Sequence, residues 1–423
     1  MDKLKQGRRK AIRAFSPGRE KMIEIPAEVR YLLDRLEKSG YEGYLVGGCV
    51  RDALLGIVPK DWDLCTCALP EEIVACFFDE KQSLSGFRHG TVGVILNKQL
   101  YEITSYRTES GYSDGRHPDT VAFVRDLTQD LARRDFTVNA MAYHPKKGLV
   151  DPWNGRKDLA EGVLRCVGDP TLRFQEDFLR ILRGLRFAAT YGLQLEEETA
   201  QAAIACREGL RQISAERIQA ELVRLLTERG TGRVIASFWP VFAVLLPECG
   251  EDERRWKALS ARIDRASNEV SVRLAVLLSD SDEAEAALSR LRLSNKLSDE
   301  VKALLRWKED LSMPLSVSVK YLLRDLGVSL ARFWIDYRFT LENRENLRRS
   351  RIKELERVLS QKECFCAEQL AIGGRELKTL GLSGPRLGEC LVYLLDQVIW
   401  GKTENAPAAL RDEAYRWMEN GDC

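Results

Sequence analysis

Short stretches in which apolar residues alternate with polar ones lie between about residues 43 and 124. Alternation of this kind, rich in β-branched and aromatic residues, indicates strands. The predicted strands are Tyr44–Gly47, Gly90–Leu96, Tyr101–Tyr106 and Val121–Val124. From about Ile25 to Ser39, apolar residues recur every three or four positions, which predicts an amphipathic helix. A mixed sheet with few helices is therefore expected in this part of the chain.

From Leu159 onward the periodicity becomes helical and stays helical to the end of the chain. The clearest predicted helices are Leu172–Tyr191, Glu197–Glu208 and Ala215–Thr227. The predicted fold class is an α/β head with a mixed sheet, followed by an all-helical neck, body and tail. Five parts are predicted along the chain: a basic N-terminal segment (1–22), the head (23–157), the neck (158–232), the body (233–335) and the tail (336–423).

Composition limits the kind of protein this can be. With 423 residues and a net charge of only +1, any surface that binds nucleic acid must be a local patch. Residues 1–22 form one such patch, which would suit RNA phosphates or a solvated tail. No run of 18 apolar residues occurs, so a membrane span is not expected. Eleven scattered cysteines fit reduced thiols in a cytoplasmic protein better than a disulfide framework.

The chemistry concentrates on two aspartates in Lys60-Asp61-Trp62-Asp63-Leu64. On an extended strand Asp61 and Asp63 point to the same face, where two carboxylates repel each other unless cations lie between them. Mg²⁺ bridged to substrate phosphates is the usual solution. Upstream, Gly47 and Gly48 allow a close backbone approach, and Arg51 carries a guanidinium suited to phosphate oxygens. An isolated Asp-x-Asp is ordinary in solvated turns, whereas this combination predicts a site for a nucleoside triphosphate and two metal ions.

Two further polar runs are ambiguous on residue chemistry alone. On sequence alone, a surface charge cluster is the favoured interpretation of Arg133-Arg134-Asp135, within the run that continues to Ala140. In the other run, Asp177, Arg180, Arg183 and Arg186 step by three along a predicted helix, with Glu176 four residues before Arg180. Such residues trace a slanting stripe. They are also what ordinary surface ion pairs look like, each worth about 0.3–0.5 kcal/mol.

Taken with Tyr44–Gly56, these runs resemble the class II tRNA nucleotidyltransferase and bacterial poly(A) polymerase branch of the polymerase-beta nucleotidyltransferase superfamily. The resemblance implies that Asp61 and Asp63 bind the catalytic metal ions. It makes Glu102, on a later predicted strand, the candidate for a third carboxylate of the site. An exposed strand glutamate without a role is the equal alternative for Glu102.

The resemblance also assigns the nucleotide. Arg134, Asp135 and Asn139 would hold the ribose, and Glu-Asp-x-x-Arg would act as a protein template. An Asp177 carboxylate accepts from the exocyclic amine of cytosine or adenine and rejects guanine and uracil, while Arg180 donates to the adjacent ring acceptors. Glu176 would hold Arg180 in position. The implied nucleotide-binding set is Gly47, Gly48, Arg51, Arg134, Asp135, Asn139, Glu176, Asp177, Arg180, Arg183 and Arg186.

Other segments extend the resemblance. Val150–Gly155 is similar to the family's hinge, and Ile213–Leu222 to a motif that caps a helix, with Ser214 as N-cap; that role is structural. In the tail, four basic residues would grip the tRNA acceptor arm through phosphate contacts, although a solvated helix face is equally consistent. These residues are Arg348, Arg349, Arg351 and Lys353.

The function expected from the resemblance is addition of C, C and A to the tRNA 3′ end from CTP and ATP, with Mg²⁺ as cofactor. The resemblance implies that family members adding only CC lack part of the loop after the first motif. Here the loop Thr108–Pro118 is intact, which argues against addition of CC only. Enzymes that add only A keep this loop, so that alternative stays open, as does a poly(A) polymerase. A catalytically silent RNA-binding protein is a different class, and the presence of both Asp61 and Asp63 argues against it.

Overall fold

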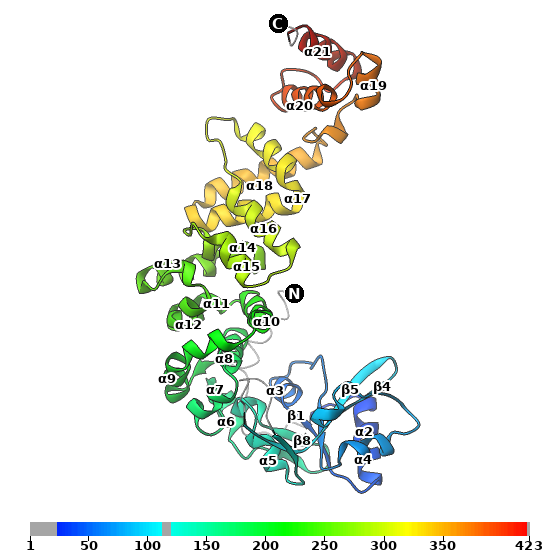
Figure 1. The fold of residues 1–423 in the computed structure, drawn as a ribbon, viewed down its shortest axis with the longest axis vertical. Helices are drawn as coiled ribbons and strands as arrows, with labels where there is room; N and C mark the ends of the chain where they lie inside the picture. The colour runs from blue at the N-terminus through cyan, green and yellow to red at the C-terminus, as the bar shows by residue number, and fades with distance from the viewer. Residues whose placement is uncertain (1–22, 112–119, 421–423) are drawn as a thin grey trace. The chain divides into compact units, whose positions relative to one another are not determined.

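The computed structural model describes residues 23–111 and 120–420 (Figure 1). The predicted basic segment at residues 1–22 and most of the predicted loop Thr108–Pro118 lie outside the described residues. The chain divides into two compact units. One reaches Ser260 and includes Arg290–Arg292, and the other comprises Ala261–Ser289 and the chain from Leu293. The predicted division into five parts is finer than this and stays a prediction.

Seven described strands of the first unit form one mixed sheet, in the order β3-β4-β5-β2-β1-β8-β9. Their bounds, in that order, are Lys81–Ser83, Thr91–Leu96, Gln99–Ser105, Leu64–Thr66, Gly43–Val46, Ala142–His144 and Gly148–Val150. The pairing of β2 with β5 is parallel, while the other neighbours are antiparallel. The mixed sheet confirms the predicted α/β head.

Short helices cover this sheet, at Ala27–Lys38 (α2), Gly48–Leu54 (α3), Pro70–Cys76 (α4) and Leu127–Ala132 (α5). The α2 helix buries Val29, Leu32, Leu33 and Leu36, whose spacing of three and four residues is the amphipathic pattern of its sequence. It packs beside α4 near β4 and β5 (Figure 1). A separate apolar cluster that includes Tyr106 joins β1, β2 and β8 to α5. Burial of these faces holds the strand ends that carry the polar residues.

One expected loop begins as a strand instead. β6 (Arg107–Ser110) pairs antiparallel with β7 (Thr120–Phe123) in a two-stranded ribbon. Thr108 lies opposite Ala122 and Glu109 opposite Val121. The polar composition of this stretch hides the strand, because Arg107 and Glu109 form ion pairs and no alternation with apolar residues marks it.

The helical region of the first unit is shorter in its pieces than the periodicity predicts. Its helices are α6 (Gly155–Glu161), α7 (Pro170–Glu176), α8 (Leu179–Tyr191), α9 (Glu197–Ala205), α10 (Ala215–Leu226), α11 (Thr231–Ser237) and α12 (Trp239–Leu245). Two strands of two residues, β10 (Val163–Leu164) and β11 (Gln194–Leu195), pair in parallel among them. The 3₁₀ turns along the described chain are Phe87–His89, Thr137–Asn139, Arg207–Gln212, Pro247–Cys249 and Ala367–Gln369.

The single helix predicted over Leu172–Tyr191 is wrong. The backbone leaves the helical region at Asp177, with φ −153° and ψ 103°, between α7 and α8. The Asp177 Oδ1 atom accepts a hydrogen bond from the Leu179 amide at 3.1 Å, so the aspartate starts the second helix rather than continuing the first. Apolar residues continue at helical spacing on either side of the break, with Phe174 buried in α7 and Leu179 and Leu182 buried in α8.

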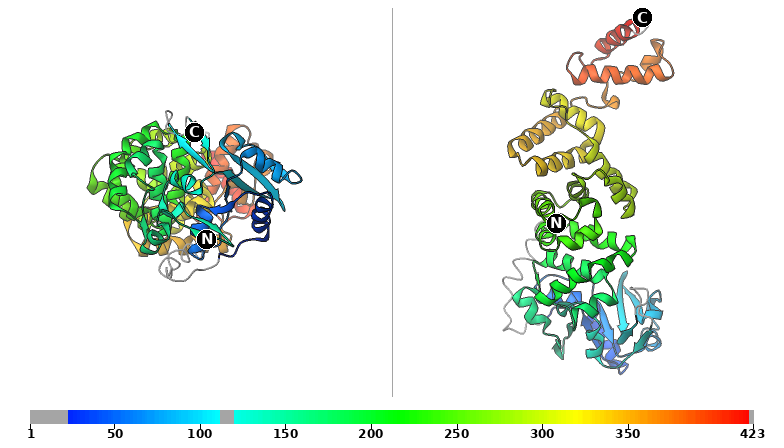
Figure 2. Two further views of the ribbon diagram at one scale, coloured as in Figure 1. Left: turned by 90° about the horizontal axis from the view of Figure 1, so that it is seen from below. Right: turned by 60° about the vertical axis from the view of Figure 1, so that its left-hand side comes forward.

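The second unit is helical throughout its described residues. Its helices are α13 (Glu253–Arg265, across the boundary), α14 (Val270–Leu278), α15 (Ala284–Arg290), α16 (Asn295–Arg306), α17 (Leu315–Glu342), α18 (Glu345–Ser360), α19 (Gly374–Thr379), α20 (Pro385–Ile399) and α21 (Pro407–Asn420). Helices α17 and α18 lie side by side (Figure 2). Gly327, with φ 70°, interrupts α17, because a left-handed residue cannot continue a right-handed helix.

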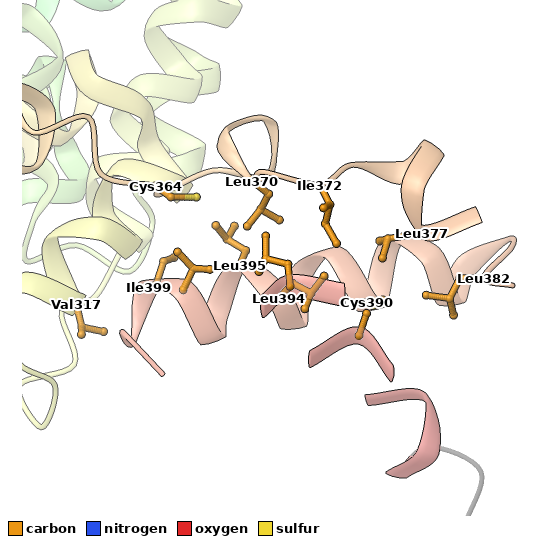
Figure 3. Packing of buried hydrophobic residues seen from close by; sticks show 13 residues of the cluster. Val317, Cys364, Leu370, Ile372, Leu377, Leu382, Cys390, Leu394, Leu395 and Ile399 are labelled. Atoms are coloured by element: carbon orange, nitrogen blue, oxygen red, sulfur yellow. The ribbon is translucent and has the colours of Figure 1, made fainter. Parts of the chain in front are cut away.

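The last helices share their own apolar cluster, which Figure 3 shows around α20. Cys390 and Leu394 of α20 meet Leu377 of α19 and Leu410 of α21, and all four are fully buried. This burial stabilises the tail. None of the described helices combines the length and the apolarity that a bilayer crossing requires. The helical body and tail predicted from the periodicity are confirmed.

Candidate active site

The two aspartates lie at the entrance to β2. Asp61 and Asp63 are exposed, while Trp62 between them is buried, so the chain alternates before the strand begins. The Val46 amide of β1 donates to the Asp63 carbonyl oxygen at 3.0 Å, which fixes this segment as an extension of the sheet. Both carboxylates therefore face away from the core, on the side where a ligand can reach them.

The electrostatics of Asp63 reflect its acidic surroundings. The pKa of Asp63 is raised above its ordinary value, first because the surrounding protein limits its hydration and then because Glu102 and Asp61 are negative nearby. Arg134 opposes the shift. Glu102 lies on β5, adjacent to β2, and its side chain is exposed. The structure thus brings the predicted third carboxylate to the acid pair.

Exposed carboxylates that repel each other suit a hard cation shared with phosphate oxygens. Among the described residues, no group of three or more His, Cys, Asp or Glu side chains is arranged to hold a metal ion by itself. A cation here would therefore draw part of its ligands from a bound triphosphate and water. The donor chemistry of Asp61 and Asp63 fits that arrangement and does not fit a closed protein cage.

Gly47 makes the turn from β1 into α3 possible. Its φ is 77°, a conformation that a residue with a side chain rarely adopts. A Cβ atom at Gly47 would also lie 3.1 Å from Nη1 of Arg134. Arg134 in turn donates to buried Asp130 at 3.3 Å. The glycine therefore lets Arg134 approach the backbone at the start of α3, beside the acid pair.

Arg51, predicted to contact phosphate, lies in a buried network. It donates to the Asn139 side-chain oxygen, to Asp52 at 2.9 Å and to the Tyr191 hydroxyl at 2.6 Å. Its guanidinium also lies over the Tyr191 ring, 4.4 Å from the centroid. Arg51 therefore braces α3 against α8. Its contact with phosphate stays a prediction.

Asp135 and Asn139 form the other half of this network. Asp135 Oδ2 accepts from Arg183 at 3.0 and 2.7 Å, and its Oδ1 accepts from Asn139 at 3.1 Å. Burial by itself would raise the pKa of Asp135, but the charge and hydrogen bonds of Arg183, with help from Asn139 and Arg180, lower it to about 2. Asp135 is therefore an ionised anchor. Its proposed contact with ribose stays a prediction.

The predicted template residues are each held by a partner of opposite charge. Glu176 pairs with Arg180, whose Nη1 also donates to the Arg173 carbonyl at 3.1 Å. Asp177 Oδ2 accepts from Arg217 at 2.8 Å. The break between α7 and α8 places Asp177 at a helix junction rather than within a continuous stripe. Its carboxylate is thereby fixed by two bonds, one from the backbone and one from α10.

Sequence reasoning missed the contribution of α10. Arg217 holds Asp177, and Glu221, buried, accepts from Arg186 at 2.6 Å. Their spacing of four residues on one helix is the signal that could have paired them with the template. Ser214 occupies the N-cap position of α10 as predicted, but its side chain makes no capping hydrogen bond. The predicted structural role of Ile213–Leu222 therefore consists in positioning the template residues.

In the tail, the four predicted RNA-binding residues lie on α18 but differ in access. Arg351 is 3% exposed, is ion-paired with Glu309 and Glu342, and is therefore removed from the candidate set. A phosphate cannot reach a guanidinium that two carboxylates already enclose. Arg348 is half-buried and donates to Asp336 at 3.3 Å.

Arg349 and Lys353 of α18 are exposed. Arg349 donates to Glu345 at 3.1 Å, in a surface ion pair that a phosphate could replace at little cost. Phosphate contacts by these two residues, and by Arg348 at its exposed edge, stay a prediction.

Comparison with known proteins gives the family. The model of the poly A polymerase head domain matches residues 43–165, and that of a probable RNA and SrmB-binding site of polymerase A matches residues 192–248. CCA-adding enzymes of Lactobacillus delbrueckii subsp. bulgaricus and Enterococcus faecalis are each 34% identical, over 93% and 95% of this chain and 98% and 99% of their own lengths.

Among solved structures, the CCA-adding enzyme of Bacillus stearothermophilus in complex with CTP matches with a TM-score of 0.78 and 28% identity. The match covers 94% of this chain and 98% of that protein. These likenesses extend across both compact units, well beyond the motifs around the acid pair. The chain belongs to the family of CCA-adding enzymes, within the class II tRNA nucleotidyltransferase and poly(A) polymerase branch, and is a nucleotidyltransferase.

Proposed function

We propose that this chain adds C, C and A to the 3′ end of tRNA, taking the nucleotides from CTP and ATP and using its own side chains as the template. The observation that carries the proposal is the anchored pair Asp177 and Arg180, in the same unit as the exposed acids Asp61 and Asp63. Full-length similarity to CCA-adding enzymes supports it.

The reaction is one nucleotidyl transfer for each added residue. The oxygen of the RNA 3′-hydroxyl forms a bond to the α-phosphorus, and the bond from that phosphorus to the β-phosphate oxygen breaks. Pyrophosphate leaves with the bonding electrons, and the hydroxyl proton is released to solvent. Asp61 and Asp63 would hold the metal cofactor, which would supply positive charge at the reacting phosphate, and Glu102 lies on the neighbouring strand.

We propose that the cofactor is Mg²⁺, held by Asp61 and Asp63. When bound, it would lower the pKa of the attacking hydroxyl and neutralise the charge that develops on pyrophosphate. Support comes from the exposure of both carboxylates and from the acidic surroundings that raise the pKa of Asp63. None of the described cysteines forms a disulfide, which suits a reducing compartment such as the cytoplasm.

Base selection rests on fixed polar groups. The Asp177 carboxylate accepts from the exocyclic amine that cytosine and adenine share, and Arg180 donates to the neighbouring ring acceptor. Guanine and uracil present a carbonyl at that position, where a carboxylate has nothing to accept. Arg217 and Glu176 keep these two side chains from turning away when no base is bound.

The test is incubation of purified protein and Mg²⁺ with a tRNA that ends at the discriminator base. We expect CMP to be added twice and then AMP, read by sequencing gels with single and mixed nucleotides. Addition of AMP alone, and only to tRNA ending in CC, would identify an A-adding enzyme. A long run of AMP on unrelated RNA would identify a poly(A) polymerase, and no addition would contradict the proposal.

The template assignment has its own arm in this experiment. Asp177→Ala removes the acceptor but leaves Asp61 and Asp63 in place. We expect UTP and GTP incorporation to rise relative to CTP and ATP by about tenfold, equivalent to about 1.4 kcal/mol of lost discrimination. Continued refusal of UTP and GTP by an active Asp177→Ala enzyme would show that another group reads the base.

A further inference from the structure

A cavity of about 220 Å³ opens beside Glu102, on the β3 and β4 side of the sheet. One water needs about 10–15 Å³ of such space, so a group the size of a sugar can enter. The side chains around it are mainly small and hydroxyl-bearing. The cavity is lined by Ser83, Ser85, Gly86, Thr91, Gly93, Leu100 and Glu102. Apart from Glu102, the candidate third carboxylate, none of these lining residues has a role in the site described above.

Strand register explains why the cavity lies there. Ser83 of β3 is opposite Gly93 of β4, and Gly93 is opposite Glu102 of β5. Directly opposed residues of antiparallel strands point to the same face, so these three stand in a row. Gly93 has no side chain, so Leu100 and Ser83 pack closely over it, and both line the cavity. A Cβ atom there would lie 2.6 Å from Leu100 Cδ1.

The same row leads to the acid pair. β5 runs parallel to β2 with Ile103 beside Leu64, so the residues just before them, Glu102 and Asp63, are neighbours. The predicted nucleotide-binding residues lie on the opposite side of β2, because Gly47 follows β1 and Asn139 precedes β8. In the strand order β4-β5-β2-β1-β8, the acids therefore separate the cavity from the nucleotide side.

Nucleotidyl transfer needs two substrates on opposite sides of one phosphorus atom, since the attacking and leaving oxygens lie roughly in line. In the proposed function, the triphosphate lies on the β1–β8 side of the acids, and its base contacts the template residues. The RNA end must then reach the acids from the side of β5. The cavity beside Glu102 lies on that side and adjoins the acids.

We propose that this cavity, the primer pocket, holds the ribose of the last RNA nucleotide with its 3′-hydroxyl turned toward Glu102 and Asp63. The proposal rests on the proposed function and deepens it by placing the second substrate. Leu100, half exposed at the rim, offers an apolar surface beside the sugar.

The hydroxyl groups of the primer pocket can serve sugar hydroxyls. Ser83 and Ser85 lie 3.4 Å apart, and Thr91 lies 3.0 Å from Thr104 of β5. Each hydroxyl donates one hydrogen bond and accepts two, so these contacts leave capacity for a ligand. A ribose presents a 2′-hydroxyl that both donates and accepts, which deoxyribose lacks. The primer pocket is therefore expected to distinguish an RNA end from a DNA end.

Steady-state kinetics of C addition test the proposal, with tRNA and CTP varied separately. In Gly93→Ala, the new methyl group has to displace Leu100 and Ser83, which line the cavity, and so narrows it. Gly93 has an ordinary φ and Leu100 is half exposed and can turn, so the fold is expected to persist. We expect the KM for tRNA to rise about tenfold, equivalent to about 1.4 kcal/mol, while the KM for CTP changes less than about twofold.

Ser85→Ala gives an independent readout. Wild-type enzyme should prefer a tRNA ending in ribose over the same tRNA ending in 2′-deoxyribose, and Ser85→Ala should reduce that preference at least about threefold in kcat/KM. Ser39→Ala, which removes an exposed hydroxyl at the end of α2, is the matched control and should behave as wild type. A thermal melt checks the fold, and Ser85→Ala carries the test should Gly93→Ala unfold.

The outcomes separate this proposal from the proposed function. If wild-type enzyme adds C, C and A but both variants keep its KM for tRNA and its ribose preference, the primer pocket is wrong and the function stands. A rise in the KM for CTP instead of tRNA would assign the cavity to the nucleotide and overturn the proposal. Wild-type enzyme that adds no nucleotide would contradict the proposed function itself.

Discussion

The acid pair and the template handle charge in opposite ways. At the entrance to β2, Asp61 and Asp63 are exposed, and limited hydration together with the neighbouring Glu102 raises the pKa of Asp63. Along α7 and α8, each charged group has a partner of opposite sign. Arg183 of α8 pairs with Asp135, whose pKa is lowered to about 2. The first region keeps charge uncompensated and the second compensates it.

The difference follows from what each region has to do. Uncompensated carboxylates attract cations and the phosphates that travel with them, and they lose their mutual repulsion when these bind. A template must instead present donors and acceptors at fixed positions before the base arrives, because groups that reorganise on binding lose selectivity. Ion pairs from a second helix provide that fixity. Three substitutions test this contrast, in order of decreasing expected effect.

Asp63→Asn should separate activity from stability. Loss of this carboxylate is expected to lower kcat/KM for nucleotide addition on the order of 10³-fold, comparable with removal of a main charge-stabilising group. Because the folded pKa of Asp63 is raised, its ionised form costs stability at neutral pH, and this cost disappears as the pH falls below that pKa. The melting temperature at pH 7 should therefore stay equal or rise, measured by calorimetry.

Asp79→Asn, at an exposed carboxylate paired with Arg35, is the control and should keep full activity. An Asp63→Asn enzyme that adds nucleotides at the wild-type rate would rule out the metal site proposed here.

Asp135→Asn should show the opposite behaviour, with a clear loss of stability. The folded pKa is about 2 and the unfolded value about 3.9, so ionised Asp135 contributes stability that is fully present above about pH 4. This contribution is lost as the pH falls through about 2. We expect a loss on the order of 2 kcal/mol at pH 7, from urea denaturation, and no loss relative to wild type near pH 2.

Glu208→Gln, which breaks the exposed pair with Arg211, should cost at most about 1 kcal/mol. If Asp135→Asn costs no more than this control, the network around Arg183 does not hold the site together.

Arg217→Met should produce the smallest and most specific change. It removes the partner of Asp177 while keeping an unbranched side chain on α10. We expect discrimination of CTP against UTP to fall roughly three- to tenfold, about 0.7–1.4 kcal/mol, with little change in the Mg²⁺ dependence of the rate. The Arg217→Lys variant should recover part of the loss, which a merely structural role would not predict.

The matched control is Arg292→Met, which breaks the exposed pair with Glu216 on the same helix. It should leave base selection unchanged. Equal effects of Arg217→Met and Arg292→Met would show that α10 acts only as a scaffold.

Much of the site could be predicted from the sequence because its parts are local. Asp61 and Asp63 are two residues apart, Gly47 marks a turn, and Glu176 with Arg180 share one stretch. Local backbone geometry and resemblance together were enough to name them. The partners that hold these groups could not be predicted, since Arg217 lies 40 residues from Asp177 and Arg183 lies 48 from Asp135.

Two predictions failed for a related reason. Periodicity continued across Asp177 because apolar spacing reports which face is buried, and it does not detect a single residue that leaves the helix. Arg351 looked like part of a basic surface, but Glu309 and Glu342 come from other parts of the chain and enclose it. A sequence shows how many charged residues a segment has, whereas their access to solvent and ligands depends on packing.

By itself, the sequence determined the α/β head, the helical remainder and the residues of the acid pair, because alternation, helical spacing and short motifs are properties of neighbouring residues. Only the tertiary structure decided which charges are compensated, that α10 anchors the template, and that Ser83, Gly93 and Glu102 form one row. Those relations arise when distant segments are brought together, and the register between strands is fixed by burial across the whole sheet.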